Sequence, residues 1–291
     1  MNAQEYGCRV CQEFCVTTDD LRRIASVFTR EMQRGLEEKT GSLKMLPSYL
    51  SSPHGREKGS VIAIDFGGTN VRILQIDLDG AGRVSVNARF RFALKDGAGA
   101  YDYTSDASNG DSLFGYIAEN IAKIVDPAKM YVLGHTFSFP CAQSGVNRAV
   151  LLHWTKEIRT RGVEGENVQD LLIRALDQRG ISNVRPVAVI NDTVGTLLAA
   201  AFANQSVDIA SICGTGHNTC YLEPRHPLTG ESMIVNMESG NFDGVSQTEF
   251  DRILDSAGER PGTQMLEKMV SGHYLGELIR IILSDMVQKG I

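Results

Sequence analysis

The sequence lacks the long apolar runs that membrane helices need. No apolar segment approaches the roughly 18–20 residues that cross a bilayer, and no basic segment followed by an apolar stretch opens the chain, as a secretory signal requires. An excess of basic charge is also missing, because the formal net charge is -6. That charge argues against nucleic acid as a partner. We therefore expect a cytoplasmic protein without membrane or nucleic-acid partners.

Cysteine is scarce, with 6 residues in a chain of 291. Cys8, Cys11 and Cys15 nevertheless lie at spacings of three and four residues. A metal or cluster site is one interpretation, but no fourth ligand lies nearby. The favoured interpretation is that the three side chains share one helical face as small hydrophobic groups. The other cysteines are scattered and are expected to be reduced.

The chain does contain enough apolar residues, 42% of the total, to bury a large core. Its length favours about two domains. A strand, a hairpin and then alternating helices and strands predict an α/β fold.

The segment 61–74 predicts two apolar strands joined by a glycine turn, Gly67-Gly68-Thr69-Asn70. Glycines let the backbone approach a ligand and leave N–H groups pointing outward, which suits a phosphate. Asp65 can hold a metal ion or its water, while side chains such as Arg72 can reach phosphate oxygens. A plain hairpin explains the segment about as well, because short glycine motifs match by chance.

The segment 208–222 repeats this layout, with a strand on each side of Gly214-Thr215-Gly216. The repetition suggests two related halves that offer glycine turns to the same phosphate chain. Between them, Asn191 and Asp192 follow a predicted buried strand, where ligands of α/β sheets collect. An N-cap role for Asp192 remains an alternative, and a cap can still be catalytic.

Several polar side chains lie beside apolar strands or on predicted helices: Asn191, Asp192, Asn218, Glu238 and Glu267. If buried, each needs partners. A polyhydroxylated ligand supplies many, because carboxylates accept hydroxyl protons and amides both donate and accept. Singly, each residue is explained by solvation or capping. Together with two glycine turns, they favour a sugar-phosphate transfer site.

Several motifs carry a family resemblance. They are 45–49, 61–74, 133–141 (Leu-Gly-His-Thr-Phe-Ser-Phe-Pro-Cys), 154–156 (Trp-Thr-Lys), 190–196 (Ile-Asn-Asp-Thr-Val-Gly-Thr), 214–221, 235–238 and 261–280. Through these motifs, in this order, the chain resembles the hexokinase/glucokinase family.

The resemblance implies two actin-like (ribonuclease H-like) α/β domains with a cleft between them, the second one incomplete. It implies an N-terminal helical segment over 1–58 that packs on the large domain. It further implies a small domain over 59–191 and the first part of the large domain over 192–291.

The function implied is phosphorylation of glucose or a related hexose at its 6-hydroxyl with Mg-ATP. Asp192 matches the general base, and Lys156 matches a residue that can offset charge on the moving phosphoryl group. Positions that match sugar contacts are Ser138, Thr155, Lys156, Asn191, Asp192, Asn218, Glu238 and Glu267. Positions that match the phosphate turns are Asp65, Gly67, Gly68, Thr69, Asn70, Arg72, Gly214, Thr215 and Gly216. Mg²⁺ would arrive with ATP and be held through water near Asp65.

The chain departs from the family pattern beside the sugar positions. Ser239 stands where tryptophan is usual, Glu157 where glycine is usual, His135 where phenylalanine is usual, and His217 where a small or hydroxyl residue is common. These changes leave the preferred hexose open. No segment matches the family's adenosine motif, so a sugar-binding module or regulator without turnover is the alternative. No pattern indicates the oligomeric state.

Overall fold

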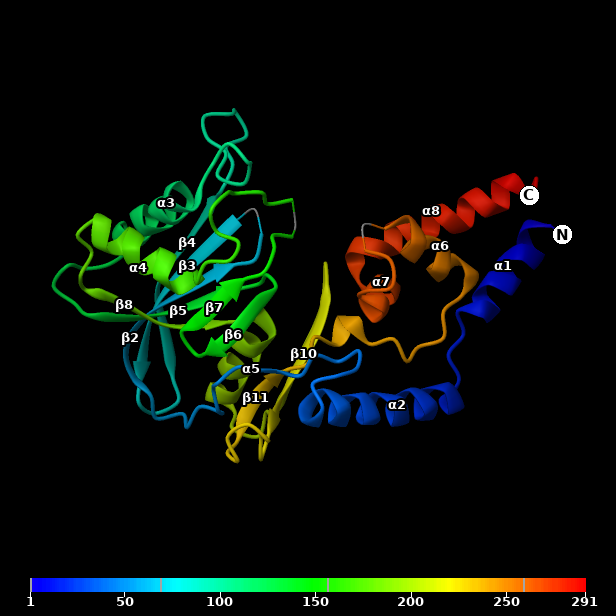
Figure 1. Ribbon diagram of the computed structural model, residues 1–291, viewed down its shortest axis with the longest axis horizontal. Coiled ribbons are helices and arrows are strands. Elements are labelled where there is room, and N and C mark those ends of the chain that lie inside the picture. The colour runs from blue at the N-terminus through cyan, green and yellow to red at the C-terminus, as the bar shows by residue number, and fades with distance from the viewer. Residues whose placement is uncertain (1, 69, 156, 259) are drawn as a thin grey trace.

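The structure, a computed structural model, describes residues 2–68, 70–155, 157–258 and 260–291. Figure 1 shows a large sheet with its helices on the left and a mainly helical group on the right. A smaller sheet lies between them. Both termini lie at the right-hand end, where α1 and α8 are neighbours.

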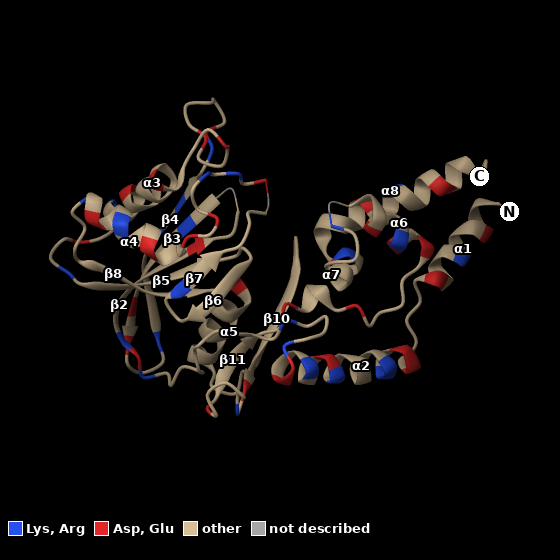
Figure 2. Ribbon diagram, in the orientation of Figure 1, with Lys and Arg blue, Asp and Glu red and all other residues tan. Residues whose placement is uncertain are grey.

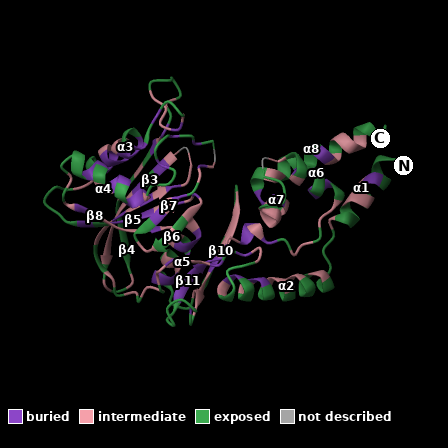
Figure 3. Ribbon diagram, viewed as in Figure 1, coloured by how far each residue is buried: buried purple, intermediate pink, exposed green. Residues whose placement is uncertain are grey.

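The large sheet has the strand order β4-β3-β2-β5-β8. Its strands are β2 (Lys58–Phe66), β3 (Asn70–Asp79), β4 (Val84–Ala93), β5 (Tyr131–Phe137) and β8 (Val184–Ile190). Successive side chains of a strand point to opposite faces, and one face buries Ile62, Ile64 and Val71. Helices α3 (Gly110–Ala122) and α4 (Val168–Gln178) pack on this face in one apolar core. Figure 3 shows buried residues gathered there.

The smaller sheet has the order β1-β11-β10-β9. Its strands are β1 (Leu46–Pro47), β9 (Ile209–Cys213), β10 (His217–Glu223) and β11 (Met233–Asn236). Helix α5 (Asp192–Ala203) packs through Val194 against Ile234. Helix α2 (Thr18–Glu37) packs on the neighbouring, oppositely directed Val235. The sheet is therefore covered by one helix on each face.

The remaining elements are one hairpin beside the large sheet and the helices of the right-hand group. They are the hairpin strands β6 (Cys141–Gly145) and β7 (Arg148–Leu151) in the larger half, and α1 (Ala3–Glu13), the 3-10 turn η1 (Ser239–Asn241), α6 (Glu249–Ala257), α7 (Met265–Val270) and α8 (Gly272–Gln288). Helix α1 docks on α8 through Tyr6, whose hydroxyl donates to the carbonyl of Ile282 at 3.1 Å. Across the described residues, no helix combines the length and the apolar character that a membrane span requires.

The α/β fold predicted from the sequence is confirmed, and so are both hairpins with glycine turns. Strands β2 and β3 pair antiparallel, as do β9 and β10. The hairpin β6–β7 was not predicted, because its polar sequence has no strand pattern. The domain bounds over 1–58, 59–191 and 192–291 stay predictions.

The packing predicted for the N-terminal cysteines is wrong. Cys8 and Cys11 lie on α1 and Cys15 lies just after it, and all three are exposed. The apolar face of α1 is instead formed by Tyr6 and by Val10, which packs in the cluster around α6 and α8. Within the described ranges, no group of three or more His, Cys, Asp or Glu residues could hold a metal ion.

Candidate active site

A chain of hydrogen-bonded amides and carboxylates lies where β10 and β11 meet the start of α5. The Nδ2 of Asn218 donates to Oδ1 of Asn236 at 2.8 Å and to Oγ1 of Thr193 at 2.9 Å. The Nδ2 of Asn236 in turn donates to Oε1 of Glu238 at 2.8 Å. The Oδ1 of Asn218 accepts from the backbone N–H of Ser239 at 3.2 Å. These bonds fix the orientation of both amides and join three separate elements.

Asn191 and Asp192 lie at the start of α5. Asn191 is the N-cap, and its Oδ1 accepts from the backbone N–H of Thr193 at 2.9 Å. Asp192 Oδ1 accepts from the same N–H at 2.8 Å. The capping role that we considered for Asp192 therefore falls to its neighbour. Within the described part of the chain, the other carboxylate oxygen of Asp192 makes no hydrogen bond, so it can accept one from a ligand.

Glu267 of α7 is tied to the second glycine turn. Its Oε2 accepts from the backbone N–H of His217 at 2.8 Å. A Cβ on Gly216 would lie 2.7 Å from the same oxygen, closer than real Cβ contacts allow. The position therefore needs glycine for Glu267 to reach the turn.

The beginning of α8 is hydrogen-bonded to the second glycine turn. The backbone N–H of Gly272 donates to the carbonyl of Gly214 at 2.7 Å, and that of His273 donates to the carbonyl of Thr215 at 3.1 Å. Gly214 and Thr215 are themselves exposed. The turn is thus fixed on the side that faces α8, and it is exposed on the other side.

The first turn carries an ion pair at its base. Arg72 Nη1 donates to Asp65 Oδ2 at 2.8 Å across β2 and β3. A Cβ on Gly67 would lie 3.5 Å from Asp65 Oδ1, an ordinary contact distance, so the Asp65 carboxylate lies next to the turn. The backbone N–H of Ser138 donates to the carbonyl of Phe66 at 3.2 Å, which brings Ser138 to the same place.

The rest of the predicted set is distributed around these two turns. Asn70 Oδ1 accepts from Nε of Arg91 at 3.2 Å. Gly68 and Thr155 are half-buried. Thr69 and Lys156 lie outside the described residues.

Electrostatics distinguishes Glu238 from the other carboxylates. Burial raises its pKa above the ordinary value of 4.5, and the negative charges of Asp192 and Glu267 raise it further. Its backbone is left-handed, with φ of 51°, which is costly for a residue other than glycine. Three carboxylates held near one another favour a ligand that donates many hydrogen bonds.

Two of the departures from the family pattern contact each other. His217 Nε2 lies 3.3 Å from Oγ of Ser239. Burial lowers the pKa of His217, while the charge of Glu267 opposes that shift. The imidazole of His217 is therefore hydrogen-bonded to Ser239 and lies near the carboxylate of Glu267.

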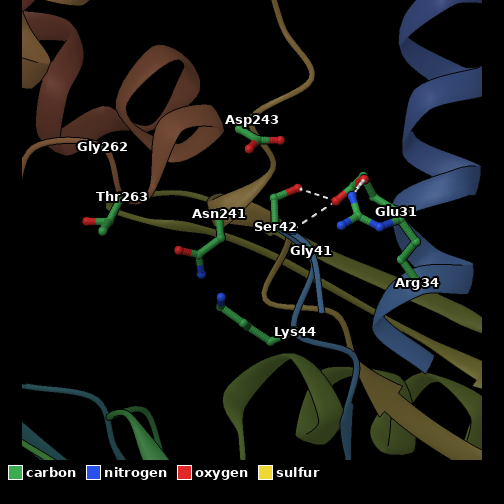
Figure 4. Close-up of a pocket in the computed structure, with 9 residues that line it drawn as sticks. All are labelled: Glu31, Arg34, Gly41, Ser42, Lys44, Asn241, Asp243, Gly262 and Thr263. Atoms are coloured by element: carbon green, nitrogen blue, oxygen red, sulfur yellow. Dashed lines mark hydrogen bonds and ion pairs between the residues drawn. The ribbon is translucent and has the colours of Figure 1, made fainter. Parts of the chain in front are cut away.

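A polar pocket of about 370 Å³ lies beside α2. It is lined by Glu31, Arg34, Gly41, Ser42, Lys44, Asn241, Asp243, Gly262 and Thr263, as Figure 4 shows. Glu31 accepts from the backbone N–H of Ser42 at 2.9 Å and from Arg34 at 2.6 Å, and these bonds lower its pKa despite burial. The positive charge of Lys44 opposes the raised pKa of Glu238.

The structure thus brings together five of the predicted sugar positions, namely Asn191, Asp192, Asn218, Glu238 and Glu267. Sequence reasoning missed Asn236 and Thr193, which link them. An asparagine that ends the fully buried strand Met233–Asn236 was the available signal, because a buried amide needs partners.

Two α/β sheets, each with a glycine turn, and polar side chains between them define the actin-like two-domain fold. Two family profiles described as hexokinase match residues 8–202 and 208–291. The chain belongs to the hexokinase family.

Individual relatives agree with this assignment. Hexokinase-2 of Rattus norvegicus is 39% identical over 94% of this chain and 31% of its own length. Hexokinase-1 of Schizosaccharomyces pombe is 36% identical over 96% of this chain and 60% of its own length. A hexokinase from Schistosoma mansoni, solved in complex with glucose, matches with a TM-score of 0.82 at 35% identity, over 99% of this chain and 68% of that one. The chain thus spans under a third of the rat relative and 60% of the yeast one.

The raised pKa of Glu238 predicts how stability depends on pH. A carboxyl with a raised pKa binds its proton more tightly in the folded state, so stability falls as pH rises from the ordinary value of 4.5 through the folded-state pKa. Replacing Glu238→Gln keeps an acceptor for Asn236 but removes this dependence. In chemical denaturation, the variant should gain stability relative to the parent as pH rises above 4.5. The exposed Glu231→Gln is the control and should show no such gain; an equal gain in both variants would contradict the account.

Proposed function

We propose that the chain is a hexokinase that phosphorylates glucose or a related hexose at the 6-hydroxyl with Mg-ATP. The observation that carries the proposal is the hydrogen-bonded set of Asn218, Asn236 and Glu238 with Asp192 at its border, in a chain of the hexokinase family. The glucose bound to the Schistosoma mansoni relative supports a hexose as the ligand.

The sugar hydroxyls would be bound by the five clustered residues, together with Ser138, Thr155 and Lys156. Carboxylates accept hydroxyl protons, and the fixed amides of this site both donate and accept. Because the network is formed before the sugar arrives, little conformational entropy is lost on binding. A hydroxyl-rich ligand would also relieve the crowding of carboxylates around Glu238.

Asp192 would act as the general base. Its free oxygen can accept the proton of the sugar's 6-hydroxyl. As that proton leaves, the 6-hydroxyl oxygen attacks the γ-phosphorus of ATP, and the bond from the γ-phosphorus to the oxygen that bridges it to the β-phosphate breaks. Phosphoryl transfer passes through a loose transition state, so positioning and charge stabilisation supply most of the rate. The N-terminus of α5 favours a negative charge at Asp192. Lys156 would offset charge on the moving phosphoryl group.

The phosphates of ATP would lie between the two glycine turns. The glycines of the two turns, Gly67, Gly68 and Gly214–Gly216, would let the backbone come close to phosphate oxygens, and Thr69, Asn70 and Arg72 would add donors. The N–H of Gly214 itself donates to the carbonyl of Gly216 at 2.9 Å, so it holds the shape of the turn. The carboxylate of Asp65, which lies next to the first turn and is partly exposed, would hold a Mg²⁺ through water. The ion, when bound, neutralises charge on the phosphates.

A sugar-binding module or regulator without phosphoryl transfer is the second candidate. The clustered sugar positions favour it as much as they favour the kinase, because binding needs only those residues. Binding of glucose without formation of glucose 6-phosphate would establish it. A cytoplasmic location and the lack of nucleic-acid or membrane partners remain predictions from the sequence.

Replacing Asp192→Ala tests the role of the base. Formation of glucose 6-phosphate should fall by about 10²–10⁴-fold, the usual contribution of a general base. Glucose affinity, measured by calorimetry, should fall far less than the rate, because one hydrogen bond to the sugar is lost while the amide network is retained. The control is the exposed Asp208→Ala, which should keep full activity. Equal rates for Asp192→Ala and the parent would refute the assignment.

Replacing Gly216→Ala tests whether Glu267 must reach the second turn. The added methyl group would displace the Glu267 carboxylate, so glucose should bind about tenfold more weakly, a loss of about 1.4 kcal/mol. Gly214→Ala is a matched control two residues away, because a Cβ there meets nothing within 4 Å. The account fails if both variants bind glucose as the parent does, or if both lose binding equally.

A further inference from the structure

One face of the large sheet carries a row of polar residues that runs across four strands. Thr136, Asp65, Arg72 and Arg91 are register partners in turn, from β5 through β2 and β3 to β4. Because directly paired residues point to the same face, all four side chains project from the face opposite the α3–α4 core. The row connects the first glycine turn with the outer edge of the sheet.

The two ends of this face are covered differently. At the β5–β8 end, α5 lies close, since a Cβ on Gly195 would be 3.4 Å from both Thr136 and Ile190. At the β3–β4 end lies a pocket of about 370 Å³ lined by Arg72, Leu74, Arg89, Phe90 and Arg91. Figure 2 shows basic segments on β3 and β4 at this end. Leu74 shares the face of the three arginines, whereas the side chain of Phe90 points to the other face and packs on the α3–α4 core, so Phe90 lines the pocket through its backbone.

The positive charge of this pocket is only partly balanced. Arg72 and Arg91 are direct cross-strand partners, an arrangement that like charges disfavour. Arg72 pairs with Asp65, but Arg91 donates only to the neutral amide of Asn70. Among the described residues, Arg89 has no hydrogen bond or ion pair. Two guanidinium charges are thus uncompensated in a chain with a net charge of -6.

We propose that Arg72, Arg89 and Arg91 form a binding site for a phosphate-type oxyanion. Guanidinium groups match such oxygens with two parallel N–H donors, and a bound anion removes the repulsion between them. The site is continuous with the first glycine turn, because Asn70 of that turn accepts from Arg91. Binding here requires neither sugar nor phosphoryl transfer, so the inference goes beyond the proposed function.

Edge protection is the competing explanation. Strand β4 is the outermost strand of its sheet, and charged side chains on an edge strand prevent pairing with other chains. That role predicts aggregation when the arginines are removed, with no change in anion binding. The two explanations therefore differ in what they predict for a ligand.

The test is calorimetric titration of the chain with inorganic phosphate and with tripolyphosphate at low salt. The double variant Arg89→Gln/Arg91→Gln should bind both anions at least about tenfold more weakly, as expected for lost charge-assisted hydrogen bonds. Arg83→Gln is the matched control, because Arg83 lies on the same hairpin, is highly exposed and pairs with Asp79. It should bind as the parent does. Equal anion binding by parent and double variant, or equal weakening in the control, would overturn the proposal.

Two further arms keep the result interpretable. Phosphate should raise the thermal midpoint of the parent but not of the double variant, and Arg89→Lys alone should retain part of the binding. If Mg-ATP competes with inorganic phosphate for the site, the triphosphate of the nucleotide is identified as the source of the anion. If Mg-ATP does not compete, free phosphate is identified as the ligand. Glucose binding should be unchanged in all arginine variants, so a failed kinase assay leaves this test intact.

Discussion

The rest of the site depends on the hydrogen bonds that the side chain of Asn218 makes. Its amide nitrogen reaches Asn236 and Thr193, while its oxygen accepts from the backbone of Ser239. One residue thus joins the start of α5, the end of β11 and the turn that presents Glu238. An apolar side chain here would leave several buried polar groups without partners, at a cost of about 1–3 kcal/mol each.

Close backbone packing sets a second constraint. The second glycine turn lies between the Glu267 carboxylate and the N-terminus of α8, and both contacts use backbone groups. These contacts leave the side chain of His217 unconstrained by the turn, whereas Gly216 must stay glycine because a Cβ there would meet the Glu267 carboxylate. The first turn has a different support, an ion pair between Asp65 and Arg72 at its base.

Much of this could be predicted from the sequence, because local signals define it. Glycine turns between apolar strands predicted both hairpins, and polar residues after strands predicted the clustered side chains. Asn236 was missed because its role arises from distant partners, Asn218 and Glu238, that only the fold brings close. The exposed N-terminal cysteines were misjudged because spacing defines a helical face but not its direction. The grouping of Arg72, Arg89 and Arg91 on β3 and β4 also depends on strand register, which the sequence alone does not specify.

We propose that the amide and carboxylate network is a preformed site for a hexose. The most direct measurement is a crystal structure of this chain grown with glucose. We predict that sugar hydroxyls lie within hydrogen-bond distance of Asn218, Glu238 and Glu267, with the 6-hydroxyl on the free oxygen of Asp192. Glucose bound elsewhere, or a network unoccupied at saturating glucose, would contradict the claim.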